Sequence, residues 1–195
     1  MLEQLIALDT ELFLFLNGIH NSFFDTVMYW ITARASSYPL YITILFFVFK
    51  RYKWRGLIVF LFMVLLVLCA DLGSVHLFKN TFERLRPSHN QEIAHLVHIV
   101  KGYRGGQFGF ISSHASNTFA YAAFTSALFS RKWFSICIFV WAIVVSYSRI
   151  YLGVHFPADI LGGAVFGMTI GFSLFKIYEL LINKLNARRA SNSVK

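Results

Sequence analysis

The chain has 195 residues and a formal net charge of +9; 57% of its residues are hydrophobic, 14% are charged, and the mean hydropathy is +0.59. This composition excludes an ordinary soluble domain, in which about 25% of residues are charged. The positive charge does not indicate nucleic-acid binding, because the cations lie in short clusters between apolar runs. We predict one integral membrane domain over residues 1–195.

Two short apolar segments occupy the first part of the chain. Residues 5–16 are interrupted by Asp9 and Glu11, and residues 23–33 are too short to span a bilayer alone. We interpret residues 1–36 as interfacial helices, with a sixth membrane crossing as the alternative. A signal peptide is not expected, because no basic segment precedes the apolar stretch.

Later apolar segments predict an all-α, polytopic transmembrane helix bundle from 37 to 183, with about five crossings. The segments are 37–49, 56–78, 114–129, 133–151 and 157–182. Basic clusters follow the first, third and fifth segments, a pattern typical of cytoplasmic loops. Residues 184–195 are therefore expected to form a cytoplasmic tail. The opposite ends would face the exterior, which in a bacterium is the periplasmic side of the cytoplasmic membrane.

Two cations mark the outer end of the second crossing. Lys79 and Arg86 are seven residues apart, so they lie about two turns apart on one face if the helix continues to Pro87. An ammonium and a guanidinium fork together suit the oxygens of a phosphate. Anchoring at the membrane surface is the alternative for these two residues. The connection 80–111 is long enough to be a binding loop.

A polar triplet, Ser112, Ser113 and His114, precedes the third crossing. A serine is expected there for structural reasons alone, because its hydroxyl can cap the helix. The free amides of a helix start also bind anions. Capping does not explain His114, whose imidazole can donate a proton to a leaving oxygen.

A second constellation joins the fourth and fifth crossings. His155 and Asp159 are four residues apart around Pro157, a residue typical of a helix start, so the carboxylate can lie within one turn of the imidazole. Such a carboxylate fixes the tautomer and leaves the other ring nitrogen free to attack. A structural histidine with an aspartate at the positive end of the helix dipole is the alternative. Arg149, six residues upstream, favours a phosphate site.

The order and spacing of these residues resemble the three signature motifs of the type 2 phosphatidic acid phosphatase family. The matching elements are Lys79-x6-Arg86-Pro87, Ser112-x-His114 and Ser148-Arg149-x5-His155-x3-Asp159. One departure concerns the second motif, which usually reads Pro-Ser-Gly-His in the family. Here Ile111 and Ser113 replace the proline and the glycine, so the contacts of this loop with phosphate are expected to differ.

The resemblance implies a membrane lipid phosphatase. His155 would be the nucleophile that forms a phosphohistidine, Asp159 would orient it, and His114 would protonate the leaving group and later activate water. The set expected to bind the phosphate consists of Lys79, Arg86, Ser112, Ser113 and Arg149. On this mechanism no metal or other cofactor is expected. His95 and His98 are spaced for metal binding, but they lack an obvious set of further ligands.

The sequence does not encode a readable preference among lipids. Our first hypothesis is undecaprenyl diphosphate, because an outward-facing site suits a carrier lipid that is turned over outside the cell. Lipid A and phosphatidylglycerol phosphate are the alternatives. A transporter that binds an anion or lipid without chemistry is the rival class, but pure binding gives no reason for the pair of His155 and Asp159. The expected partners are the substrate lipid and the bilayer.

Overall fold

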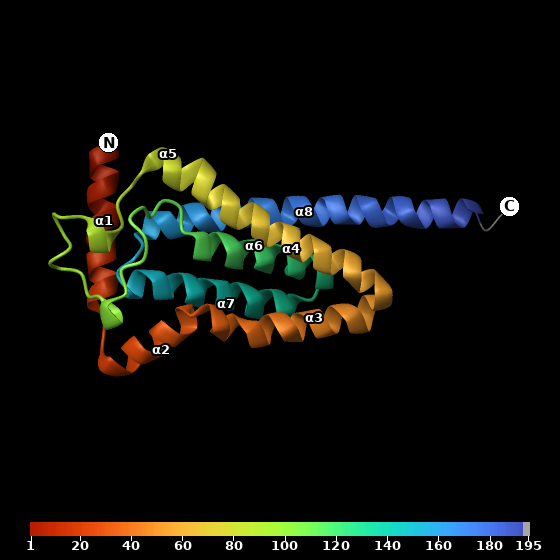
Figure 1. The fold of residues 1–195 in the computed structure, drawn as a ribbon, viewed down its shortest axis with the longest axis horizontal. Helices are drawn as coiled ribbons and strands as arrows, with labels where there is room; N and C mark the ends of the chain where they lie inside the picture. Colours follow the sequence, from red (N-terminus) through yellow and green to blue (C-terminus); the bar gives the residue numbers. More distant parts are fainter. Residues whose placement is uncertain (193–195) are drawn as a thin grey trace.

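A computed structural model describes residues 1–192, and helices make up most of that length (Figure 1). The helices are α1 Leu2–Gly18, α2 Ser22–Thr32, α3 Tyr38–Tyr52, α4 Gly56–Gly73, α5 Asn80–Phe82, α6 Ser113–Phe129, α7 Lys132–Tyr151 and α8 Pro157–Asn192. A π-helical turn, Ser74–Lys79, joins α4 to α5. No β-strand occurs within residues 1–192, and the predicted all-α class is confirmed.

Helices α3, α4, α6, α7 and α8 run along the long axis as a bundle, and α1 lies across one end of it (Figure 1). Three described stretches are long and apolar enough to cross a membrane: Ala35–Phe82, Lys132–Tyr151 and Pro157–Arg188. The first of them contains both α3 and α4, which fold back on each other as a hairpin (Figure 1). The predicted membrane helix bundle is confirmed, while the number of crossings stays a prediction.

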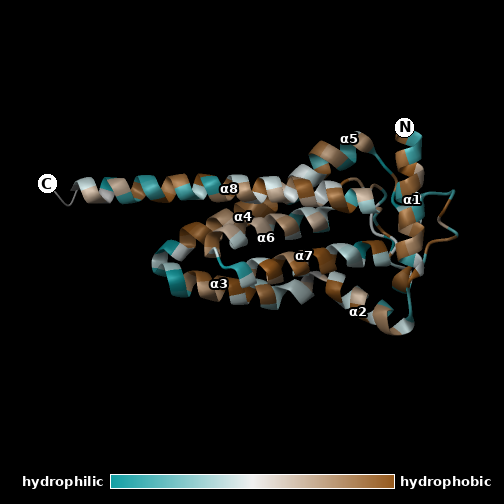
Figure 2. Ribbon diagram, turned by 180° about the vertical axis from the view of Figure 1, so that it is seen from behind, coloured by the Kyte–Doolittle hydropathy of each residue, from teal (hydrophilic) through white to brown (hydrophobic). Residues whose placement is uncertain are grey.

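The third predicted crossing, α6, has 17 residues and lies at the centre of the bundle. Its hydroxyl side chains Ser116, Thr118 and Thr125 are buried. A helix surrounded by other helices can carry such groups, because they contact protein rather than lipid. The surrounding helices instead expose large apolar side chains, and polar residues gather at the α3–α4 turn (Figure 2). This distribution is what a bilayer favours.

Three glycines of α8 let it pack closely against α6. Gly163, Gly167 and Gly171 are spaced four residues apart and therefore share one face. A Cβ added at Gly167 would lie 2.2 Å from the carbonyl oxygen of Ser116, and one at Gly171 would lie 2.4 Å from that of Ala120. The close approach also sets the distance between the start of α6 and the start of α8, where the polar triplet and Asp159 lie.

Gly167→Ala is expected to destabilise the bundle by about 1–3 kcal/mol, because the added methyl group meets backbone that cannot move alone. The free energy of unfolding of the purified protein in mixed micelles measures this effect. Gly18→Ala is the control, since a Cβ at Gly18 would have nothing within 4 Å. Equal unfolding free energies for the Gly167→Ala variant and the unmodified protein would contradict the packing described here.

One local expectation needs correction. The helix does not continue from Lys79 to Arg86: it ends at Phe82, and Glu83 has a left-handed backbone with a φ of 46°. Pro87 disfavours helical geometry at the residue before it, and Arg86 is extended. At the other end of the chain, α8 continues through Asn192, so the described part of the expected tail is helical. Its location in the cytoplasm stays a prediction.

The remaining connection, from 83 to 112, is mostly irregular and covers the end of the bundle beside α1 (Figure 1). An isolated bridge pairs Leu85 with Phe108 and holds its two ends together. Neither α1 nor α2 is among the stretches long enough to cross a membrane. Their placement in the membrane interface stays a prediction.

Candidate active site

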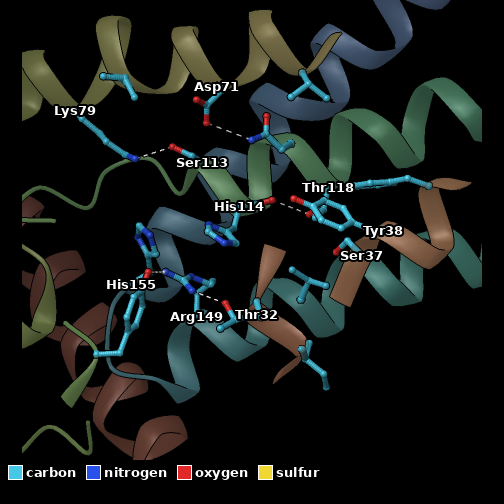
Figure 3. Close-up of a pocket in the computed structure, with 18 of the residues that line it drawn as sticks. Thr32, Ser37, Tyr38, Asp71, Lys79, Ser113, His114, Thr118, Arg149 and His155 are labelled. Atoms are coloured by element: carbon cyan, nitrogen blue, oxygen red, sulfur yellow. Dashed lines mark hydrogen bonds between the residues drawn. The ribbon is translucent and has the colours of Figure 1, made fainter. Parts of the chain in front are cut away.

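The residues singled out in the sequence converge at the end of the bundle that carries the long connection. They line or adjoin a cavity of about 580 Å³ between α2, α4, α6 and α7. Six of the eight predicted site residues line it directly: Lys79, Arg86, Ser113, His114, Arg149 and His155. Figure 3 labels these residues except Arg86. The other two, Ser112 and Asp159, are fully buried behind it.

His155 and Asp159 form the expected pair. The Nδ1 atom of His155 lies 3.2 Å from Oδ2 of Asp159, and their side chains are 1% and 0% exposed. Oδ2 also accepts a hydrogen bond of 3.0 Å from the backbone N–H of Phe156. α8 begins at Pro157 as predicted, which places Asp159 in its first turn. With Nδ1 held by the carboxylate, Nε2 is the nitrogen available for reaction.

The surroundings of His155 keep its ring neutral. Burial lowers the pKa of His155 well below its ordinary value of 6.5, and the charges of Arg86, Arg149 and Lys79 lower it further. A neutral imidazole has the lone pair that a nucleophile needs. The lowered pKa therefore favours the neutral form of His155.

Tight turns hold His155 between the two helices. Gly153 has a φ of 75°, a conformation that glycine adopts without steric cost, and a Cβ there would lie 2.8 Å from the carbonyl oxygen of His98. Gly109 approaches from the other side, and a Cβ there would lie 2.9 Å from Oδ2 of Asp159. These glycines let two backbone segments close around the imidazole.

Arg86 and Arg149 are buried cations at the same end of the cavity, with side chains oriented by the backbone and by neighbouring polar groups. Arg86 is 7% exposed and donates from Nε to the carbonyl oxygen of Phe108 at 3.1 Å. Arg149 is 2% exposed and donates to the hydroxyls of Thr32 and Tyr103, the latter at 3.2 Å. Its Nε atom is buried without a hydrogen-bond partner among the described residues. Such a donor set suits the oxygens of an anion.

Lys79 and Ser113 hold the opposite wall. The ammonium of Lys79 donates to Oγ of Ser113 at 2.6 Å, and Ser74 shares a further hydrogen bond of 2.6 Å with the same oxygen. The serine that replaces the family glycine is therefore tied to the cation beside the site (Figure 3). Its hydroxyl takes part in the site rather than merely filling the turn.

Ser112 has the structural role that the sequence left open. Its side chain accepts from the backbone N–H of Ala115 at 3.4 Å and caps α6, and its own N–H donates to the carbonyl oxygen of Asp159 at 3.0 Å. It therefore joins the start of α6 to the start of α8. His114 lies two residues after Ser112, is half-buried and lines the cavity (Figure 3).

Several residues of this site were not found from the sequence. Thr32 and Tyr103 hold Arg149, and Arg84 donates to Oδ1 of Asp159 at 3.0 Å. Asp9 in turn receives a 2.6 Å hydrogen bond from Arg84. Each of these contacts joins parts of the chain that are far apart in the sequence, so no local spacing predicts them.

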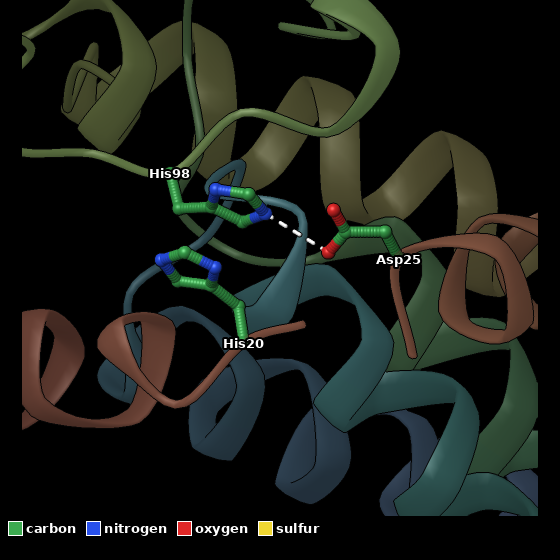
Figure 4. Close-up of side chains that lie close together, drawn as sticks. All are labelled: His20, Asp25 and His98. Atoms are coloured by element: carbon green, nitrogen blue, oxygen red, sulfur yellow. Dashed lines mark hydrogen bonds and ion pairs between the residues drawn. The ribbon is translucent and has the colours of Figure 1, made fainter. Parts of the chain in front are cut away.

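A separate cluster contains His20, Asp25 and His98 (Figure 4). The carboxylate of Asp25 lies 2.9 Å from Nε2 of His98 and accepts from the hydroxyl of Tyr151 at 2.8 Å. The rings of His20 and His98 are parallel, with centroids 3.6 Å apart. Lone pairs in two stacked planes do not point at one common centre, as a metal ion requires. His95, the other histidine considered, is exposed and outside this cluster.

A bundle of apolar helices with buried cations, a neutral histidine and a carboxylate around one cavity defines a membrane protein that handles phosphate. The model of the PAP2 superfamily matches residues 56–182. The chain therefore belongs to the PAP2 superfamily, and the family resemblance of its motifs is confirmed. It is an integral membrane lipid phosphatase, a hydrolase that acts on phosphate esters.

The chain is similar to known proteins over most of its length. It is 40% identical to a lipid A 4'-phosphatase from Bacteroides thetaiotaomicron over 195 residues, which covers 99% of this chain and 85% of the relative. It is 29% identical to an undecaprenyl-diphosphatase from Sulfolobus acidocaldarius over 171 residues, covering 87% and 78% of the two chains. A crystal structure of a PAP2-type phosphatidylglycerolphosphate phosphatase from Bacillus subtilis has a TM-score of 0.71 and 27% identity, covering 92% of this chain and 88% of that chain.

Proposed function

We propose that this phosphatase removes a phosphomonoester from lipid A or a closely related phosphorylated glycolipid. The observation that carries this proposal is the 40% identity to a lipid A 4'-phosphatase over nearly the whole chain. A second lipid A 4'-phosphatase, from Porphyromonas gingivalis, is 38% identical over 178 residues. The identity to an undecaprenyl-diphosphatase is lower, so our first hypothesis has less support than its alternative.

The proposed reaction has two steps. In the first, Nε2 of His155 attacks phosphorus, the bond to the sugar oxygen breaks, and His114 gives that oxygen a proton. In the second, His114 takes a proton from water, the hydroxide attacks the phosphohistidine, and inorganic phosphate leaves with His155 restored. The two steps regenerate both histidines.

The cations stabilise the phosphoryl group as it passes between oxygen and nitrogen. Arg86 and Arg149 are already buried, so their guanidinium groups meet the transferring oxygens with little reorganisation. Lys79 and Ser113 approach from the opposite wall of the cavity. We propose that the amides of the first turn of α6 complete the phosphate site, with Ser112 shaping that turn.

The cavity extends beyond the phosphate site in a way that suits a sugar. Asp71 is an exposed carboxylate on the otherwise apolar α4, and its Oδ1 accepts from Nδ2 of Asn117 at 3.3 Å. Both residues line the cavity, with apolar neighbours that include Val67 and Val75 (Figure 3). A carboxylate in an apolar helix is costly and usually has a function. We assign it to hydroxyl or amide donors of the sugar ring.

Asp71→Ala is expected to lower kcat/KM for lipid A about tenfold, which is the effect of one hydrogen bond to a charged group. The same substitution is expected to change kcat/KM for undecaprenyl diphosphate less than about twofold, because a polyprenyl chain has no donors for the carboxylate. Glu83→Gln is the control, an exposed acidic residue near the same end of α4. Equal losses on both lipids would contradict the sugar contact.

Phosphate release by the purified protein tests the proposal. The substrates are lipid A bearing the 4'-phosphate, undecaprenyl diphosphate and phosphatidylglycerol phosphate, each in the same detergent. We expect the highest kcat/KM for lipid A. A higher value for undecaprenyl diphosphate would restore the first hypothesis, and absence of release from all three lipids would favour a protein that binds its lipid without chemistry.

The charge pattern supports a proposal for the orientation of the site. Basic residues gather at the α3–α4 turn and at the α6–α7 turn, at the ends of the bundle opposite to the cavity. Because basic loops stay in the cytoplasm, we propose that the cavity opens at the outer face of a bacterial cytoplasmic membrane. A lipid could then keep its acyl chains in the bilayer while its phosphate reaches His155.

A further inference from the structure

One face of α1 is directed at the segment that holds the proposed nucleophile. Asp9, Phe13 and Asn17 are spaced four residues apart and share that face. Phe13 is fully buried and packs edge-on against Phe156, with ring centroids 5.3 Å apart. Asn17 is 1% exposed, and its Nδ2 donates to the carbonyl oxygen of Tyr151 at 2.9 Å. The helix thus contacts both sides of the turn that carries His155.

A chain of charged groups connects this face to the catalytic carboxylate. Oδ2 of Asp9 accepts from Nη2 of Arg84 at 2.6 Å, and Nη1 of Arg84 donates to Oδ1 of Asp159 at 3.0 Å. Oδ2 of Asp159 holds Nδ1 of His155. The side chains of Asp9 and Arg84 are 11% and 25% exposed, so water competes only in part for these hydrogen bonds.

The same groups also hold the start of α8. Oδ1 of Asp9 accepts from the backbone N–H of Ala158 at 2.8 Å. An N–H in the first turn of a helix has no partner within that helix, so Asp9 supplies one. The guanidinium of Arg84 lies over the ring of Phe156, 4.2 Å from its centroid. Asp9 and Arg84 therefore fix both the backbone beside Asp159 and one oxygen of its carboxylate.

We infer that Asp9 and Arg84 are positioning residues that hold Asp159, and through it His155, in line for attack on phosphorus. The inference rests on the proposed function, because it needs His155 to be the nucleophile. Neither residue touches the cavity, so both act on the rate of the chemical step rather than on lipid binding. Asp9 lies outside the part of the chain that matches the superfamily model, which begins at residue 56. The N-terminal helix is thereby a working part of the site.

A double-mutant cycle tests the inference. The variants of the full chain are Asp9→Asn, Arg84→Gln and the double variant, and kcat and KM for dephosphorylation of lipid A are measured for each in detergent. We expect Asp9→Asn to lower kcat about tenfold, as the loss of one charged hydrogen bond does. Arg84→Gln is expected to lower kcat about 100-fold, because Asp159 loses its outer partner and the pair shifts. KM should change less than about twofold in each variant.

The double variant is expected to lose no more activity than Arg84→Gln alone, because Asp9→Asn keeps an oxygen that can accept from the N–H of Ala158 and removes only the charged contact with Arg84. Arg84→Lys should recover part of the loss, since an ammonium can reach one of the two carboxylates. The controls are Glu11→Gln, which removes an exposed charge from the same helix, and Arg131→Gln, at the far end of the bundle. The unfolding temperature of each variant separates lost activity from lost folding.

Three outcomes would overturn the inference. Unchanged kcat in Asp9→Asn and Arg84→Gln would remove both residues from the site. Losses that multiply in the double variant, or losses confined to KM, would show that the two residues act separately or on binding. If the wild-type protein releases no phosphate, or if its release does not depend on His155, the proposed function is overturned as well. If the wild-type protein is active through His155 and the Asp9 and Arg84 variants are unaffected, this inference alone is overturned.

Discussion

His155→Ala is expected to reduce phosphate release from lipid A by at least about 10⁴-fold, since the variant lacks the nitrogen that we propose attacks phosphorus. The buried imidazole is held at one nitrogen by Asp159, and no other histidine in the described part of the chain is buried. Neighbouring cations would still bind the phosphate, so lipid affinity should fall far less than the rate. Initial rates of release and lipid binding by the same variant measure the two effects.

His89→Ala is the control for His155, because His89 lies in the long connection and outside the cavity lining. It is expected to keep the rate of the unmodified protein within about twofold, as substitutions away from special features do. A His155→Ala variant with substantial phosphate release would contradict the assignment of the nucleophile. An inactive variant that has also lost binding would point to a damaged site rather than to lost chemistry.

Arg149→Gln is expected to lower kcat by about 10²–10³-fold, the effect of removing one donor that stabilises charge in a transition state. Arg149 is almost completely buried, is positioned by Thr32 and Tyr103, and has a further buried donor at Nε. We propose that its guanidinium donates to the phosphoryl oxygens from this position. Steady-state kinetics of the variant on lipid A give the loss in kcat and any change in KM.

Arg149→Lys is a second variant at this position. It keeps the positive charge and removes the planar guanidinium group. It is expected to recover less than about a tenth of the wild-type rate, since lysine cannot donate in two fixed directions. The matched substitution Arg131→Lys, at the cytoplasmic end proposed here, should leave the rate unchanged. A fully active Arg149→Lys variant would show that only a positive charge is needed at this position.

The local parts of this site could be predicted from the sequence. Pro157 starts a helix and places Asp159 one turn from His155, and Ser112 caps the helix that carries His114. Both results depend on backbone preferences that extend over four or five residues. The same is true of the membrane helices, whose length and apolar composition are visible in the chain.

The prediction that was wrong and the residues that were missed depend on contacts between distant parts of the sequence. Lys79 and Arg86 meet at one cavity although the helix between them ends at Phe82, because the bridge of Leu85 to Phe108 turns the chain back. The partnership of Asp9 with Arg84 spans most of the first half of the chain. No periodicity encodes such a contact. From the sequence, Asp9 indicates only that residues 5–16 are a poor membrane-spanning segment.

The central claim is that His155 carries the phosphoryl group between the lipid and water. Rapid-quench analysis with lipid A labelled at its 4'-phosphate tests it most directly, by following the label in protein and in inorganic phosphate under alkaline conditions that preserve phosphohistidine. The account predicts labelled protein within the first turnover, with the phosphoryl group mapped to His155 and with no label in His155→Ala. Phosphate release by wild-type protein that never passes through labelled His155 would contradict it.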